Sequence, residues 1–288
     1  MEGRTMAPLS SSIDLAEHRA DSVVALLTRN LVPLFSLDSR EKPDFEGTGV
    51  LLRVGASHFL VSAAHVFDVI GFGGCLMWEG LGELELSGTA ILTKAPDGGG
   101  RDKDRVDLGV LQLTDGEVAR IGERNFLSRR DLAPQEAAAP QATYLAVGFI
   151  ARDQLRDDDR QVYKTRTSRY LGMEAGEDAY HYIKVIRDSH LALAFDRRNV
   201  VGPRGRGAPP SFKGMSGCGV WRLNPLVEYT ETLRPSLVAT LIEQPPEYPK
   251  SLLCTRVELL LAVIRKSFPE LAHEIPPSPL LSVRTQGP

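Results

Sequence analysis

The stretch GMSGCGVW, residues 214–221, places three glycines and one serine around the start of an apolar run. A serine among glycines is either a nucleophile exposed on a tight turn or a turn residue before a buried strand. Taken alone, the stretch favours the turn residue, because glycine and serine are both common. A serine nucleophile needs a base that takes its proton and an acid that orients the base. The rest of the chain therefore decides the role of Ser216.

The composition is that of a soluble globular protein. The chain has 288 residues, of which 42% are hydrophobic and 25% charged, and its formal net charge is −3. This length gives one large domain or two packed ones. The charge does not indicate nucleic-acid binding, and no apolar run approaches the roughly 20 residues that span a bilayer. Residues 1–22 lack the apolar core of a signal peptide, so we expect a cytoplasmic protein without nucleic-acid or membrane partners.

The three cysteines, Cys75, Cys218 and Cys254, are too few and too scattered to indicate a disulfide framework or a zinc site. Each lies beside apolar residues, and we expect all three to be buried as small hydrophobic side chains. The sequence therefore predicts neither a metal site nor a cofactor.

Most of the chain consists of short apolar or alternating runs that turn residues separate. This pattern is typical of strands in an antiparallel barrel or sandwich. Residues 14–29 and 256–268 instead have helical spacing, which predicts one helix near each end. The predicted strands are residues 31–37, 47–54, 58–66, 83–93, 106–113, 142–150, 162–171, 179–186, 217–223 and 237–243.

Three stretches are predicted to lie between these elements. Residues 129–141 are rich in proline and alanine, which indicates a linker between two halves of the chain. In residues 151–161 aspartates alternate with arginines, which indicates a solvated hairpin tip rather than a metal site. Residues 197–210 are expected to form a mobile loop before Ser216, rather than a basic nucleic-acid contact.

One histidine and one aspartate are the best partners for Ser216. His65 ends the apolar run FLVSAAHV, behind small residues that leave room around its ring. Asp107 opens the run DLGVLQL, where a carboxylate needs hydrogen bonds to offset its desolvation, and a histidine N–H is a suitable donor. From the residues alone, a purely structural role for His65 stays open. Asp68 also stays open as the acid that orients His65.

The segments GTGVLL, FLVSAAHV, DLGVLQL and GMSGCGVW, in this order, resemble the trypsin-like (chymotrypsin-fold) serine peptidases, and more narrowly their disulfide-free bacterial relatives. The resemblance covers residues 45–245. It implies an all-β fold of two packed six-stranded antiparallel β-barrels with the site in the cleft between them. Residues 31–130 would form the first barrel, and residues 140–270 the second barrel with the C-terminal helix. Residues 1–30 would be a leader and helix, and residues 271–288 a flexible tail.

The resemblance implies a serine endopeptidase that works through an acyl-enzyme intermediate. Ser216 would attack the scissile carbonyl, His65 would accept and return the proton, and Asp107 would orient the histidine. The backbone N–H groups of Gly214 and Ser216 would form the oxyanion hole. Met215 stands where secreted members of the family carry an aspartate that pairs with a newly cut N-terminus, so we expect no activation by N-terminal cleavage.

The resemblance also indicates substrate-binding residues. Pro210, six residues before the serine, would lie at the base of the primary pocket, and its lack of charge argues against a preference for Lys or Arg. Lys213 would lie near the rim of that pocket and favour acidic substrate residues. The substrate backbone would pair with the chain at Thr240, Leu241 and Ile242.

Several functions stay open from the sequence. The chain is a peptidase that is active alone, a peptidase that an activating partner protein switches on, or a silent trypsin-like fold that binds peptides or proteins. The complete set of serine, histidine and aspartate favours a peptidase, because a binding module is free to lose any of them. A non-peptide acyl hydrolase is also open, although the α/β-hydrolases have the order Ser–Asp–His.

Overall fold

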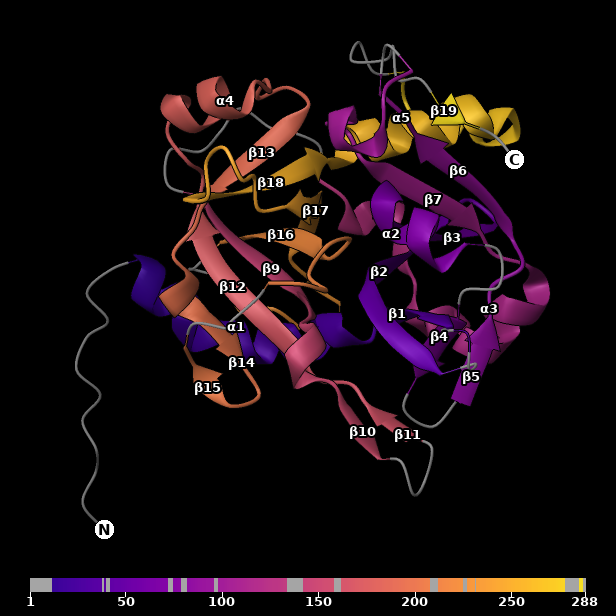
Figure 1. The fold of residues 1–288 in the computed structure, drawn as a ribbon, viewed down its shortest axis with the longest axis horizontal. Coiled ribbons are helices and arrows are strands. Elements are labelled where there is room, and N and C mark those ends of the chain that lie inside the picture. Colours follow the sequence, from indigo (N-terminus) through magenta and orange to yellow (C-terminus); the bar gives the residue numbers. More distant parts are fainter. Residues whose placement is uncertain are drawn as a thin grey trace.

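The computed structural model consists mainly of two antiparallel β-sheets that stand side by side (Figure 1). It describes residues 12–37, 39, 42–71, 75–78, 82–95, 98–133, 142–157, 162–207, 212–224, 227–230, 232–277 and 285–286.

The first sheet comes from the N-terminal half of the chain together with one short C-terminal strand. Its strand order is β19-β6-β7-β3-β2-β1-β4-β5, and β8 pairs with β2. The strands are β1 (Leu31–Leu37), β2 (Pro43–Val54), β3 (Ser57–Ala63), β4 (Cys75–Trp78), β5 (Gly82–Glu85), β6 (Thr89–Thr93), β7 (Leu108–Gln112), β8 (Leu127–Ser128) and β19 (Thr285–Gln286). Helices α2 (Ala64–Ile70) and α3 (Asp115–Ile121) follow β3 and β7 in the chain.

The second sheet comes from the C-terminal half. Its strand order is β13-β18-β17-β16-β9-β12-β14-β15. The strands are β9 (Thr143–Phe149), β12 (Thr167–Met173), β13 (His190–Ala194), β14 (Val200–Gly202), β15 (Gly205–Arg206), β16 (Gly219–Leu223), β17 (Ser236–Glu243) and β18 (Ser251–Arg256). Strands β10 (Leu155–Asp157) and β11 (Val162–Lys164) form a separate ribbon, and helix α4 (Glu177–Ile183) precedes β13.

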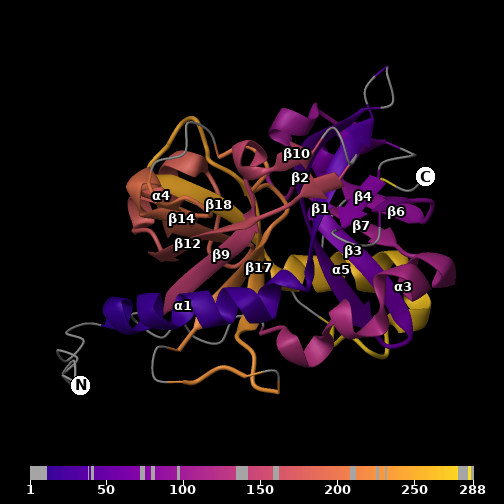
Figure 2. The same ribbon diagram turned by 90° about the horizontal axis from the view of Figure 1, so that it is seen from below.

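The N-terminal helix α1 (Ser12–Thr28) lies along the second sheet (Figure 2). Ala20, Val23 and Leu27 on α1 are fully or almost fully buried. Arg169 on β12 donates to Glu17 on α1 at 2.8 Å, so a buried guanidinium reinforces the apolar contact. None of the described helices is long and apolar enough to cross a membrane.

The C-terminal helix α5 (Val257–Ser267) follows β18 directly and contacts strands of both sheets. Leu260, Val263 and Ile264 on this helix are buried in the largest apolar cluster. The same cluster contains Phe59 of the first sheet and Trp221 of the second. A continuous apolar core therefore joins the two sheets and fixes the loops that lie between them.

The structure confirms the prediction of a mainly β fold with two antiparallel halves and a helix near each end. The expected six strands per barrel become sheets of nine and eight strands. The short strands β8 and β19 belong to the first sheet, and β14 and β15 belong to the second. The segment 271–288 was expected to be a flexible tail, yet its strand β19 pairs with β6. The expected linker 129–141 is described only up to residue 133.

Several element predictions were wrong for local reasons. Residues 179–186 do not form a strand, because Ala179, Tyr180 and Ile183 have helical spacing and bury one face of α4. Residues 197–207 do not form a mobile loop, since they contain a 3-10 turn and the β14–β15 hairpin, which pairs with β12.

The sequence did not predict strands β13 and β18, and it placed the bounds of several other strands differently. The predicted strand 58–66 ends at Ala63, where α2 begins. The run 83–93 is two strands, β5 and β6, and the run 162–171 is likewise divided between β11 and β12. Apolar runs alone do not mark these interruptions.

Candidate active site

His65 and Asp107 lie side by side because β3 and β7 are paired. The pairing of Ala63 with Leu108 places the first turn of α2 next to the residue before β7. The backbone N–H of Ala64 donates to the carbonyl oxygen of Asp107 at 2.9 Å and holds the two segments together. Two residues that are 42 positions apart in sequence are thereby fixed next to each other.

The side chain of Asp107 makes two hydrogen bonds with His65. Its Oδ2 lies 2.5 Å from Nδ1 of the His65 ring, and its Oδ1 accepts from the His65 backbone N–H at 2.9 Å. The Asp107 side chain is almost completely buried, whereas that of His65 is 38% exposed. A carboxylate in this position selects the tautomer with its proton on Nδ1, which leaves Nε2 free to accept a proton.

The electrostatics of this pair follow from burial and charge. Burial lowers the pKa of His65, but the hydrogen bond and the negative charge of Asp107 outweigh it and raise that pKa above 6.5. The carboxylate of Glu243 also raises the pKa of His65. Burial raises the pKa of Asp107 above its usual value, while the hydrogen bonds from His65 oppose this.

Asp107 adopts a backbone conformation that few residues other than glycine adopt, with φ at +41°. Such a conformation persists only where the surroundings enforce it. On one side, the N–H of Leu108 donates to the Thr93 hydroxyl at 2.8 Å, and that hydroxyl donates to the buried Asp104 at 2.7 Å. On the other, the N–H of Val106 donates to Asp104 at 3.2 Å.

Two buried residues of the second sheet also hold the segment that carries Asp107. The Thr255 hydroxyl donates to the carbonyl oxygen of Val106 at 2.6 Å. Nε2 of His190 lies 2.8 Å from the carbonyl oxygen of Arg105. Burial lowers the pKa of His190 to about 4, so this ring is neutral near pH 7 and donates from Nε2. The second sheet therefore helps to position the acid of the first.

The first sheet in turn holds the segment that carries Ser216, through the buried Thr48 on β2. The Thr48 N–H donates to the carbonyl oxygen of Ser216 at 2.9 Å. The Thr48 hydroxyl donates to the carbonyl oxygen of Gly214 at 2.8 Å. The Thr48 carbonyl oxygen accepts from the Ser62 hydroxyl at 2.7 Å. One residue thus connects β2, β3 and the turn around the serine.

The turn around Ser216 presents two unused donors. The N–H groups of Met215, Gly217 and Cys218 donate to backbone carbonyl groups. Those of Gly214 and Ser216 donate to no backbone carbonyl in the described part of the chain. The carbonyl oxygen of Lys213 accepts from the N–H of Ala151 at 3.0 Å, and the Gly214 N–H of the same planar peptide therefore points away from Ala151.

Gly214 has φ at +98°, and a Cβ there would lie 2.2 Å from the ring of Phe45. Both the conformation and the close approach require glycine. This accounts for the first glycine of GMSGCGVW.

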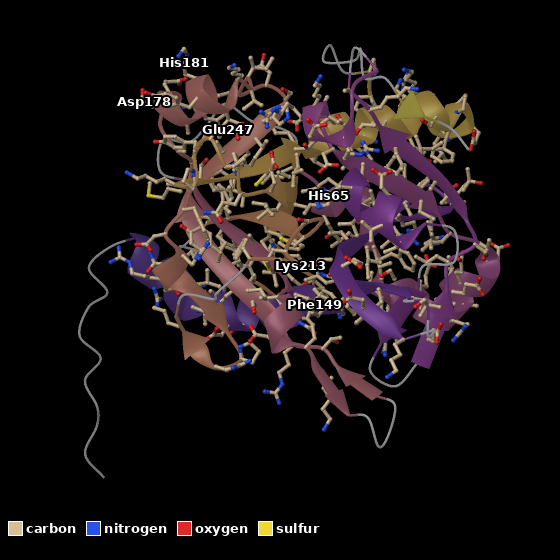
Figure 3. The ribbon with its side chains drawn as sticks, viewed as in Figure 1. His65, Phe149, Asp178, His181, Lys213 and Glu247 are labelled. Atoms are coloured by element: carbon tan, nitrogen blue, oxygen red, sulfur yellow. The ribbon has the colours of Figure 1, made fainter. Side chains whose placement is uncertain are left out.

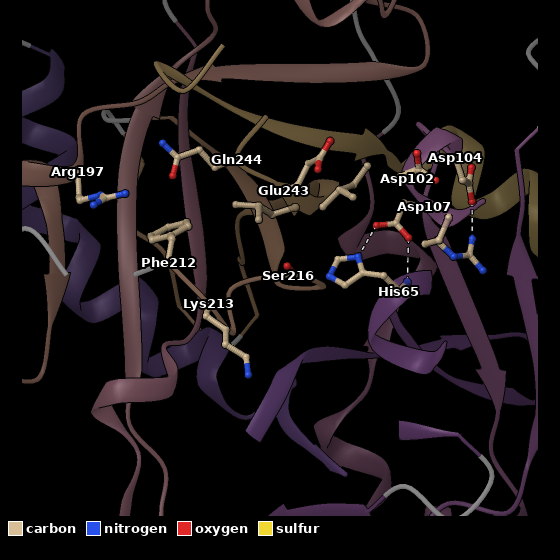
Figure 4. A pocket seen from close by; sticks show the side chains of 13 residues that line it. His65, Asp102, Asp104, Asp107, Arg197, Phe212, Lys213, Ser216, Glu243 and Gln244 are labelled. Carbon is tan, nitrogen blue, oxygen red and sulfur yellow. Dashed lines mark hydrogen bonds and ion pairs between the residues drawn. The ribbon is translucent and has the colours of Figure 1, made fainter. Parts of the chain in front are cut away.

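His65 and Ser216 line one cavity of about 490 Å³ between the two sheets (Figure 4). In Figure 4, His65 lies between Ser216 and Asp107. No hydrogen bond joins the side chains of Ser216 and His65 among those recorded for the described residues. Bonds of this kind are commonly long before substrate binds and tighten in the reacting complex.

The other sequence-predicted residues divide into three groups. Lys213, Leu241 and Ile242 line the cavity. Thr240 does not, because it is buried in β17 between its partners on β16 and β18. Pro210 lies outside the described residues.

Several residues of the cavity wall were not predicted from the sequence. Arg197 was assigned to a loop, and Phe212, Glu243 and Gln244 carried no pattern that indicates a site. The available signal was closeness in sequence: Phe212 lies just before GMSGCGVW, Glu243 ends β17 and Gln244 follows it. Figure 3 shows His65 and Lys213 facing the region between the two sheets.

The structure describes the side chains of two of the three cysteines, Cys218 and Cys254. Cys218 and Cys254 are free and buried, as expected, and burial raises the pKa of the Cys218 thiol well above its usual value. This thiol is therefore not a second nucleophile. Within the described ranges, no group of three or more His, Cys, Asp or Glu side chains is arranged to hold a metal ion.

Comparison with known proteins identifies the fold. No protein-family model and no curated protein matches the chain. The solved structure of GrC is 14% identical with a TM-score of 0.52, and covers 84% of this chain and 94% of its own. That of HL collagenase is 12% identical with a TM-score of 0.51, with the same coverage of each chain.

The active form of the Rv3671c protease from M. tuberculosis is 14% identical with a TM-score of 0.47, over 92% of this chain and 93% of its own. The first two likenesses show that this chain has the fold of the trypsin-like, chymotrypsin-fold serine peptidases.

Proposed function

We propose that this protein is a serine endopeptidase whose catalytic residues are His65, Asp107 and Ser216. The observation that carries the proposal is the hydrogen bond between His65 and the buried Asp107, because both residues line the same cavity as Ser216. A histidine oriented by a buried carboxylate is the base that a serine nucleophile needs. The chymotrypsin fold, in which such a triad lies between two β-sheets, supports the same assignment.

In the proposed reaction Ser216 Oγ attacks the carbonyl carbon of the substrate while Nε2 of His65 takes the hydroxyl proton. The oxyanion that forms accepts hydrogen bonds from the N–H groups of Gly214 and Ser216. His65 then gives its proton to the leaving amine, and an acyl-enzyme remains on Ser216. Water, deprotonated by His65, attacks this ester. His65 then returns the proton to Ser216 Oγ as the acid leaves, and Asp107 stabilises the imidazolium in both steps.

Digestion of a complex peptide library tests the proposal. The purified full-length protein is incubated with the library, and new termini are identified by mass spectrometry. We expect cleavage products with the wild-type protein and none with Ser216→Ala, compared at equal folded concentration. Equal cleavage by both proteins would assign the activity to a contaminant and contradict the proposal.

The proposal also predicts a pH dependence. His65 acts as a base only in its neutral form, and the Asp107 carboxylate raises the pKa of His65 above 6.5. As the pH falls, a larger fraction of His65 is protonated and cannot act as a base. kcat/KM therefore decreases with decreasing pH. We expect kcat/KM for a cleaved peptide to rise between pH 5 and 9, with its midpoint above 6.5. A flat profile across this range would contradict the role of His65 as general base.

A further inference from the structure

The cavity at Ser216 has one acidic end and one basic end. Asp102, Asp104 and Asp107 lie on the His65 side of Ser216, whereas Arg197 and Lys213 lie on the other side (Figure 4). The walls on that second side also include the side chains of Phe212 and Gln244. Arg101 also lines the cavity on the His65 side, but Asp68 and Asp104 pair with it, so the charge of the described lining is negative on that side and positive on the other.

The three basic side chains of the cavity differ in how they are paired. Arg101 donates to Asp68 at 2.7 Å and to Asp104 at 2.6 Å, so its positive charge is paired with carboxylates of the protein. Lys213 lies 3.9 Å from Glu46. Arg197 forms no ion pair with any residue that the structure describes.

The neighbouring arginine explains why Arg197 keeps its charge for another partner. Arg197 begins a 3-10 turn, Arg197–Asn199, and Asp196 precedes it. The Asp196 carboxylate accepts from the backbone and the side chain of Arg198, with its shortest contact at 2.6 Å. The carboxylate closest in sequence is thereby bound to Arg198 rather than Arg197.

The walls between Ser216 and Arg197 are neutral and held in place. The ring of Phe212 packs against Phe195 with centroids 5.1 Å apart. The amide of Gln244 donates to the carbonyl oxygen of Pro249 at 2.6 Å. Phe212 and Gln244 therefore bring no negative charge to this end of the cavity.

We propose that Arg197 binds the side-chain carboxylate of a Glu or Asp in the substrate, at the residue whose carbonyl reacts with Ser216. The proposal rests on the peptidase function proposed above, and it names the substrate class. A guanidinium binds a carboxylate through two parallel hydrogen bonds, which favours an acid strongly over its amide. Lys213 adds positive charge to the same end of the cavity.

Binding to the inactive protein tests this inference separately from catalysis. Fluorescent, C-terminally amidated peptides that differ only in one central residue, Glu or Gln, are titrated into full-length Ser216→Ala. We expect the Glu peptide to bind about 10- to 100-fold more tightly, the range for a charged bidentate pair. In Ser216→Ala/Arg197→Ala the difference disappears. In the control Ser216→Ala/Arg130→Ala, which removes an exposed arginine that does not line the cavity, it persists.

Cleavage by the active protein gives the second readout. Wild-type digestion products are expected to end in Glu or Asp, and Arg197→Glu is expected to shift these ends towards Lys and Arg. Equal affinity for the Glu and Gln peptides, or a preference that survives Arg197→Ala, would overturn the inference. So would a preference that appears only with peptides having a free C-terminal carboxylate. A Glu preference in binding without any cleavage would uphold the inference and refute the peptidase.

Discussion

Replacing Asp107 by Asn is expected to lower kcat/KM by about 10⁴-fold while the fold is retained, the usual size of this effect in serine triads. The backbone N–H of His65 donates to Oδ1 of Asp107, so the side-chain amide of the variant would keep its oxygen there and turn its NH₂ towards Nδ1. Nδ1 must then accept a hydrogen bond, and the ring proton moves to Nε2. A protonated Nε2 cannot take the proton of Ser216.

Asp68 provides the matched control for this variant. It lies three residues after His65, but its carboxylate binds Arg101 rather than the histidine. Asp68→Asn is therefore expected to change kcat/KM by about threefold or less, the scale of an exposed ion pair. Steady-state kinetics on one cleaved peptide, with circular dichroism to verify folding, compares the two variants. A large loss in Asp68→Asn together with a small one in Asp107→Asn would exchange the roles of the two aspartates.

Replacing Gly217 by Ala is expected to destabilise the whole protein by about 3–5 kcal/mol. Gly217 has φ at +85°, and a Cβ there would lie 2.0 Å from the Ser62 hydroxyl and 2.1 Å from the carbonyl oxygen of Thr48. Both neighbours are buried and joined by a hydrogen bond, so neither can withdraw without breaking it. The clash falls where the two sheets meet, which is why it affects the complete fold.

Thermal unfolding measures this effect. At about 2–4 °C per kcal/mol, the midpoint of Gly217→Ala should fall by roughly 6–20 °C. Gly207→Ala is the matched control, because nothing lies within 4 Å of a Cβ at that position and its φ is not positive. A Gly217→Ala midpoint within about 1 °C of wild type would contradict the packing described around Thr48.

The sequence predicted the sheets and the three candidate catalytic residues because these depend on local patterns. Apolar runs between turn residues mark strands, and His65 and Asp107 each stand at an end of such a run. The glycines of GMSGCGVW mark a turn that needs positive φ, which Gly214 and Gly217 both adopt. The pairing of β3 with β7 then brings His65 and Asp107 together.

The sequence did not predict the contacts that depend on tertiary packing. Thr48 follows a glycine in an apolar strand, and nothing in that pattern shows that it binds the turn around Ser216. His190 carried no pattern that indicated a role, although its Nε2 binds the carbonyl oxygen of Arg105 in the segment before β7 of the other sheet. Arg197 belongs to a basic stretch, and only the pairing of Arg198 with Asp196 distinguishes it. The first two roles depend on contacts between residues far apart in sequence. The third depends on which of two adjacent arginines pairs with Asp196.

The most direct test of a triad in this protein is covalent labelling of the isolated chain by a fluorophosphonate, which reacts with activated serines. Wild type, Ser216→Ala and His65→Ala are compared after circular dichroism verifies that each is folded. The proposed triad predicts that wild type is labelled at Ser216. The labelling rate of each variant should be lower than that of wild type by about 100-fold or more. A folded wild type that is not labelled, or labelling that persists in His65→Ala, would contradict it.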